Sequence, residues 1–116
     1  MGIQERKARE REQRKEQIVN AAEEVFFRNG YTQSTMQHVA DVAELSKGTL
    51  YLYFKSKEEL HYAINLRGMV KLHELMTEEY TPRQSGFDNL MAMSRAYLKF
   101  FKSYPNYFAA IVHFET

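Results

Sequence analysis

The sequence of 116 residues contains no cysteine, no tryptophan, two prolines and five glycines. Without cysteine the chain forms neither disulfides nor thiolate metal sites. The only loop signals that contain proline are Thr81-Pro82 and Tyr104-Pro105, and the rest of the chain has the pattern of helices. The length suits one domain with a modest core, and a second complete domain is not expected.

Long apolar runs are also missing. No uncharged apolar stretch approaches the ~18 residues that a membrane helix needs, and the first residues are too highly charged for a signal peptide. We therefore expect a soluble, cytoplasmic protein with no membrane partner.

Charge is nearly balanced, with a formal net charge of +1. Residues 1–57 hold ten Lys/Arg and eight Asp/Glu, and residues 58–116 hold six and seven, so the basic excess is N-terminal and small. The segment "RKAREREQRKEQ" has two interpretations: a basic arm for the DNA backbone or minor groove, or a solvated helix face, which is the commoner role of such charge runs.

The first helix is predicted from the spacing of its apolar residues, which recur at the positions of a buried stripe: Ile18, Ala21, Ala22, Val25 and Phe26. Asn29-Gly30 should end it, with Gly30 in the left-handed cap conformation. Ser34 and Gln37 then predict a capping box for a short second helix, whose apolar face is Met36, Val39, Ala40 and Ala43.

The stretch "LSKGTLYLYFKSKEEL" predicts a third helix capped by Ser46 and the start of a fourth, capped by Ser56 with Glu59. Two short helices joined by a few residues are typical of a helix-turn-helix. If Leu50 and Phe54 face the core, other side chains are turned outward or flank that face without any core role: Lys47, Tyr51 and Tyr53.

A DNA duplex accounts for these features together. The amides of the helix start and the Ser46 hydroxyl suit a phosphate, Lys47 suits guanine O6 and N7 in the major groove, and tyrosine hydroxyls suit phosphates. Gly48 weakens a helix, but it lets another backbone approach closely. Lys57, at the next helix start, is expected to bind the DNA backbone on the other side of the groove.

"TMQHVADVAELSKGTLYLYFKSKEEL" is similar to the signature of TetR-type transcriptional regulators, and "IVNAAEEVFFRNGYTQST" resembles their first helix and turn. The resemblance implies an all-α protein: a homeodomain-like, three-helix DNA-binding domain over residues 14–60, followed by a helical ligand-binding and dimerisation domain. Its helix-turn-helix motif covers about residues 35–54. Residues 1–13 are a charged extension, and residues 61–116 are only part of the second domain.

The same resemblance implies which residues contact DNA. They lie at the start of the second helix, along the third and at the start of the fourth: Thr35, Met36, Gln37, Ser46, Lys47, Gly48, Thr49, Tyr51, Leu52, Tyr53 and Lys57. One residue departs from the family pattern. Glu44 stands where the turn usually has glycine, and a non-glycine residue in a left-handed turn costs about 1 to 2 kcal/mol. We expect the strain to be tolerated.

In the second half, the long helix from Ser56 should end near Tyr80, and Pro105 permits a last helix to start. Between them, another helix follows Gly86 with an apolar face of Phe87, Leu90, Met91, Tyr97, Leu98 and Phe101. Such stripes are more often plain core, but the resemblance implies an effector pocket in this domain. Its candidate residues are Met91, Tyr97, Phe101, Tyr107 and Phe108.

The resemblance further implies a ligand-responsive repressor that binds a palindromic operator as a homodimer and is released by a small-molecule effector. Because family members are usually longer, it also implies that this chain is a fragment of the full-length protein. An enzyme is not expected, since the four histidines are scattered and no nucleophile, phosphate-loop, cofactor or metal motif is present. The alternative function is a helical protein-interaction module that does not bind DNA.

Overall fold

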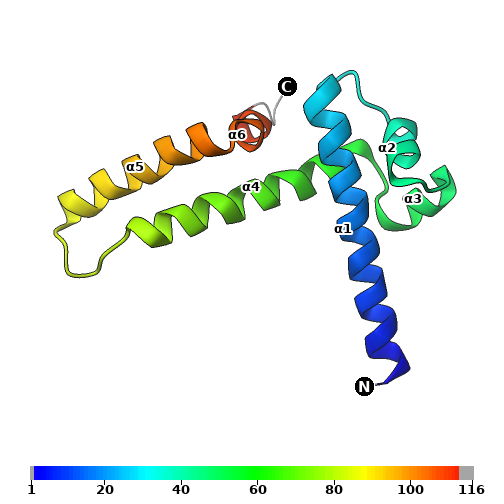
Figure 1. Ribbon diagram of the computed structural model, residues 1–116, viewed down its shortest axis with the longest axis horizontal. Coiled ribbons are helices and arrows are strands. Elements are labelled where there is room, and N and C mark those ends of the chain that lie inside the picture. The colour runs from blue at the N-terminus through cyan, green and yellow to red at the C-terminus, as the bar shows by residue number, and fades with distance from the viewer. Residues whose placement is uncertain (1, 113–116) are drawn as a thin grey trace. The chain divides into compact units, whose positions relative to one another are not determined.

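The computed structural model describes residues 2–112, and over these residues the chain contains only helices (Figure 1). The predicted all-α class is confirmed. None of the helices in this range is both long enough and apolar enough to cross a membrane. The chain divides into two compact units, Met1–Ala63 and Ile64–Thr116. Between residues 2 and 112 six helices follow one another: α1 (Ile3–Asn29), α2 (Met36–Ala43), α3 (Lys47–Tyr53), α4 (Lys57–Glu79), α5 (Gly86–Ser103) and α6 (Pro105–Val112).

In the first unit, α1 packs on α2 and α2 packs on α3. The stripe predicted for α1 is confirmed, because all five of its apolar residues are buried. The apolar residues predicted to face the core from the next two helices are buried as well: Met36, Val39, Ala40, Ala43, Leu50 and Phe54. The helix-turn-helix therefore rests on a core built mainly by the second half of α1.

Two details at the end of α1 differ from the prediction. Gly30 has positive φ, at 82°, but its ψ of 156° lies outside the left-handed helical region. Ser34 does not cap α2. It is buried, and its hydroxyl donates to the carbonyls of Gly30 at 2.6 Å and Val25 at 3.3 Å, so it closes the loop back onto α1. A serine hydroxyl can accept from a backbone amide or donate to a backbone carbonyl. Here it donates to carbonyls of α1 and its following loop, and so it does not cap α2.

The cap of α2 is Thr35. Its hydroxyl accepts from the His38 backbone N–H at 3.1 Å, and the imidazole Nδ1 of His38 accepts from the Thr35 N–H at 3.3 Å. This reciprocal pair is a capping box shifted by one residue from the predicted pair, with histidine in place of glutamine. The box ties down two amides that the helix itself leaves without partners.

The cap predicted for α4 is confirmed in part. The Ser56 hydroxyl accepts from the Glu59 N–H at 3.2 Å, while the Glu59 carboxylate reaches the Lys55 N–H at 2.7 Å and not that of Ser56. The helix ends at Glu79, next to the predicted end at Tyr80. Pro105 begins α6 as predicted, where its fixed φ suits a first helical residue.

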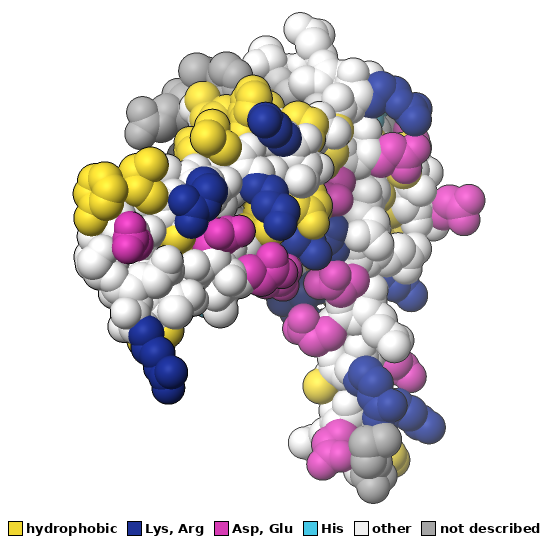
Figure 2. Space-filling model, turned by 60° about the vertical axis from the view of Figure 1, so that its left-hand side comes forward, with side chains coloured by type: hydrophobic (Ala, Val, Ile, Leu, Met, Phe, Trp, Pro, Cys, Tyr) yellow, Lys and Arg dark blue, Asp and Glu magenta, His cyan; other side chains and the backbone are white. Residues whose placement is uncertain are grey.

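In the second unit, α5 packs on α6, and the buried face of α5 differs from the predicted one. The buried residues are Ala92, Ala96 and Phe100, whereas the residues predicted as its apolar face are exposed, from 71% for Phe87 to 45% for Tyr97. Figure 2 shows apolar side chains gathered in yellow on this unit. The small Ala92 and Ala96 let another helix approach closely, and the large Phe100 is buried on the same face of α5.

Gly68 in α4 offers a test of how closely α4 approaches α6, because a Cβ there would lie 3.1 Å from the Tyr107 Cβ and 3.3 Å from the Ile111 Cδ1 of α6. Gly68→Val is expected to lower the free energy of unfolding by about 1 to 3 kcal/mol through overpacking. Gly86→Val is the matched control, since nothing lies within 4 Å of a Cβ at that position. Urea unfolding followed by circular dichroism measures both, and an equal effect of the two substitutions would contradict the close helix approach.

Candidate nucleic-acid interface

The turn between α2 and α3 is built on Glu44, which has φ 59° and ψ 43°. The predicted left-handed turn is thus confirmed, and glutamate tolerates it. The Glu44 N–H bonds to the carbonyls of Ala40 and Asp41, and the Leu45 N–H bonds to that of Ala40 at 2.9 Å. These bonds end α2 and turn the chain into α3 within three residues.

Glu44→Gly is expected to be neutral or to stabilise the protein by roughly 0.4 to 1 kcal/mol, because relief of the left-handed strain exceeds the entropy that glycine loses on folding. Glu44→Ala is the control, since it removes the same carboxylate but keeps the strain. Thermal unfolding of both variants is the measurement. A clear loss of stability in the glycine variant would mean that the Glu44 side chain itself supports the turn.

The start of α3 has the predicted cap. The Ser46 hydroxyl accepts from the Thr49 N–H at 3.1 Å and is 2.9 Å from the Thr49 hydroxyl. Lys47 and Gly48 are exposed, and a Cβ on Gly48 would meet only the Ser46 hydroxyl at 4.0 Å. The first turn of α3 is therefore open to a large partner.

Along the rest of α3, Leu52 is 67% exposed, while Tyr51 and Tyr53 are half-buried. The two tyrosines flank the buried Leu50, as the sequence predicts. The guanidinium of Arg11 lies over the Tyr53 ring, 5.5 Å from its centroid, which is a cation–π contact. Sequence reasoning missed Arg11, although its place in a charged run next to the helix-turn-helix was a signal.

At the start of α2 the three predicted contact residues have different surroundings. Thr35 is exposed, but its hydroxyl is part of the capping box. Gln37 is exposed and donates to the Asp41 carboxylate at 2.8 Å. Met36 is only 8% exposed, because it is the first residue of the apolar face of α2. A DNA contact is thus geometrically open to Thr35 and Gln37 and restricted for Met36.

The Lys57 side chain makes hydrogen bonds within the protein. Its ammonium donates to the carbonyls of Tyr31 at 2.8 Å and Ser34 at 3.0 Å, and lies 4.3 Å from the centroid of the Tyr31 ring. Lys57 thereby joins the start of α4 to the loop that follows α1. Its predicted contact with the DNA backbone stays a prediction and would compete with these bonds.

The Tyr31 side chain adds to this junction. Its ring stacks on that of the buried His61, with centroids 4.7 Å apart. Burial and the neighbouring Glu58 carboxylate, which is hydrogen-bonded to Tyr31, raise the pKa of the Tyr31 hydroxyl. The pKa of Glu58 is lowered, first by a hydrogen bond from its own backbone N–H in the first turn of α4 and then by Ser56, Tyr31 and Lys57. At neutral pH the Tyr31 hydroxyl therefore stays protonated and the Glu58 carboxylate stays ionised.

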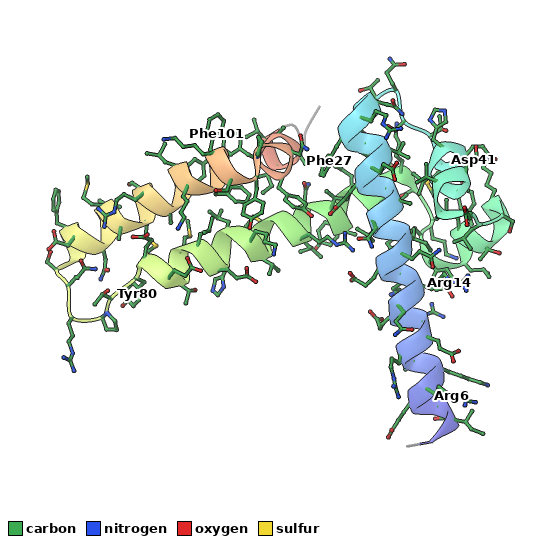
Figure 3. The ribbon with its side chains drawn as sticks, in the orientation of Figure 1. Arg6, Arg14, Phe27, Asp41, Tyr80 and Phe101 are labelled. Atoms are coloured by element: carbon green, nitrogen blue, oxygen red, sulfur yellow. The ribbon has the colours of Figure 1, made fainter. Side chains whose placement is uncertain are left out.

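The candidate effector residues come together only in part. Phe108 of α6 is half-buried and contacts the rings of Tyr97 and Phe101 at centroid distances of 5.7 and 4.7 Å. Tyr107 is half-buried, 6.2 Å from the Tyr104 ring. Met91 is 45% exposed and has no part in these ring contacts. Figure 3 shows Phe101 on the outer side of α5.

The helix α3 is short, capped and exposed on one face, and a tight turn joins it to α2 within a core of three helices. This arrangement defines the class of helix-turn-helix DNA-binding transcriptional regulators. Within that class, residues 18–64 match the family of bacterial regulatory proteins called the tetR family. Over these residues the chain therefore matches the TetR family of transcriptional regulators.

Individual regulators of known sequence or structure are also similar to this chain. The chain is 36% identical over 74 residues to a fatty acid metabolism regulator protein of Bacillus subtilis, covering 64% of this chain and 38% of that protein. It superposes with TM-score 0.70 and 30% identity on a TetR-like transcriptional regulator from Rhodococcus, covering 84% of this chain and 53% of that one. A gamma-butyrolactone receptor gives TM-score 0.65 and 27% identity over 87% of this chain and 53% of its own. The chain thus spans about half or less of the length of these relatives.

Proposed function

We propose that the protein binds a specific operator sequence in double-stranded DNA by placing α3 in the major groove. The observation that carries this proposal is the open first turn of α3, where Lys47 and Gly48 are exposed beside the Ser46 cap. A lysine in that place can donate to guanine O6 and N7, and the Ser46 hydroxyl can bind a phosphate.

The proposed contacts divide into two kinds. Base contacts come from the exposed groups of α3, namely Lys47 and the apolar side chain of Leu52, which suits a thymine methyl group. Phosphate contacts come from hydroxyl, amide and ammonium groups that hold the helix in register: Thr35, Gln37, Ser46, Gly48, Thr49, Tyr51, Tyr53 and Lys57. Met36 packs in the core beneath α2, so only its small exposed part can contact DNA.

We further propose that the full-length protein is a homodimer that acts in the cytoplasm as a repressor on a palindromic operator. Two recognition helices must lie about 34 to 36 Å apart, or a multiple of that, to enter successive major grooves on one face of DNA. Effector binding in the second unit would change this spacing and release the operator. The exposed apolar side chains of α5 support an interface there, since surfaces of this kind mark interaction sites.

The proposed effector site centres on the aromatic group of Tyr97, Phe101 and Phe108, with Tyr107 and Met91 at its margins. An aromatic lining favours an apolar small molecule. Two relatives are named as a fatty acid metabolism regulator and a gamma-butyrolactone receptor, which is consistent with an apolar effector.

The test is selection of bound sequences from random duplex DNA with the full-length protein, followed by affinity measurements on the selected site at several salt concentrations. A specific regulator should enrich one motif, and its affinity should fall steeply as salt rises, because phosphate contacts release counterions. Failure to enrich any motif, together with an affinity that does not depend on salt, would favour a protein-interaction module instead.

A further inference from the structure

The first four turns of α1 extend beyond the rest of the first unit. The helix begins at Ile3, but its first buried residue is Ile18, and Figure 1 shows this segment reaching past α2 and α3. It lies outside the residues that match the family. Its presence as regular helix shows that the charged run is not an irregular arm.

One face of this segment carries a row of cations, which we call the cationic stripe. Lys7, Arg11 and Arg14 follow the i, i+4, i+7 spacing of a single helix face. The same spacing continues through Ile18 to the buried Ala22 and Val25, which belong to the face of α1 that packs on α2.

The cationic face therefore continues the core-facing stripe and lies on the side of α1 where α2 and α3 are. Figure 3 shows Arg14 on α1 where the helix leaves that core.

The acidic residues of the segment are mostly on the other side. At 3.6 residues per turn, Glu5, Glu12 and Glu16 lie opposite the stripe, and only Glu10 lies beside it. The ion pairs of Arg28, Lys71 and Arg95 do not involve these cations. Like charges at i, i+4 repel one another and weaken a helix slightly, so the stability of α1 itself does not account for this arrangement.

The stripe borders the recognition helix. The stripe cations, Ala8 and Glu10 line an open hollow of about 370 Å³ together with Tyr53, the last residue of α3, and Arg11 lies over the Tyr53 ring. Arg14 is half-buried beside it, whereas Lys7 and Arg11 are exposed. An anion in this hollow would meet guanidinium groups that form paired hydrogen bonds with phosphate.

We propose that Lys7, Arg11 and Arg14, with Tyr53, form a second DNA contact that binds the phosphate backbone beside the major groove entered by α3. The inference rests on the proposed function, because α3 must dock for the stripe to meet the backbone. The three cations span about 10 Å of helix axis, a length over which a duplex carries several phosphates. The contact adds affinity for every sequence and reads no bases.

The test compares two double variants that remove the same charge from the same helical segment. Lys7→Ala with Arg11→Ala removes two stripe cations, and Arg6→Ala with Arg9→Ala removes two cations from another face. All four residues are exposed and alanine is the best helix former, so both variants should fold, which circular dichroism checks.

The slope of log affinity against log salt should become shallower by about 2 per protomer for the stripe variant, since each phosphate contact contributes about 0.9. The other variant should change it by less than half as much. Replacing single DNA phosphates with neutral methylphosphonates should weaken DNA binding by the unsubstituted protein at certain positions. At those positions the replacement should not affect DNA binding by the stripe variant.

Equal salt slopes for the two variants would overturn the inference, because the effect would then come from net charge alone. An unchanged phosphate map in the stripe variant would overturn it as well. If Lys47→Ala abolishes sequence preference while the stripe variant behaves as the unsubstituted protein, the proposed function stands and only the second contact is rejected. If the unsubstituted protein binds no duplex DNA at all, both proposals fail.

Discussion

Replacing Lys47 with alanine is expected to weaken binding to the selected operator by about 5- to 150-fold, the 1 to 3 kcal/mol that a base contact contributes, and to relax sequence preference. Lys47 is exposed in the first turn of α3, so its side chain is not part of the buried core. Tyr51→Phe removes only a hydroxyl, which we assign to a phosphate. It should therefore weaken binding to all sequences alike and leave the preferred motif unchanged.

Fluorescence titrations against the selected operator and against single-base variants of it measure both effects. Lys99→Ala is the control for charge, because it removes one exposed lysine from α5 in the other unit. The assignment is wrong if Lys47→Ala and Tyr51→Phe both retain full affinity, or if Lys99→Ala costs as much as Lys47→Ala.

Lys57→Met is expected to lower the free energy of unfolding by about 1.5 to 3 kcal/mol, the range for hydrogen bonds that involve a charged group. The substitution keeps the aliphatic stem but leaves the carbonyls of Tyr31 and Ser34 without their ammonium donor. It also removes the cation from the Tyr31 ring. The loop after α1 would then lose its direct tie to the start of α4.

Lys55→Met is the matched control. The Lys55 ammonium makes one bond, to the Tyr51 carbonyl at 2.8 Å, but it is exposed and the bond spans only four residues. Its loss should cost less than about 0.5 kcal/mol. Urea unfolding compares the two, and equal costs would contradict the tie. A variant at Lys57 that keeps its stability but loses DNA affinity would instead favour the phosphate contact predicted from the sequence.

Much of the fold could be predicted because its signals are local. The Ser46 cap, the turn at Glu44 and the start of α6 at Pro105 each depend on residues within four positions of one another. The buried stripe of α1 has helical spacing and needs no knowledge of its partner. The family signature covers the same region, so fold class and the place of the recognition helix followed from residues alone.

The tertiary structure decided what depends on residues distant in the sequence. Lys57 binds carbonyls 23 and 26 residues away, so no local pattern could distinguish this tie from a DNA contact. A serine at position 34 could either cap α2 or close the loop on α1. It closes the loop, because its hydroxyl donates to the Val25 carbonyl of α1.

The sequence by itself determined the helices, the Ser46 cap and the position of α3, because hydrogen bonds within a helix and its turns join near neighbours. The tertiary structure alone decided which face of α5 is buried and that the cations of α1 border Tyr53. Periodicity shows that a helix has an apolar face, but the elements that pack against it decide which apolar residues are buried. In α5 these are Ala92, Ala96 and Phe100, whereas Leu90 and Phe101 stay exposed.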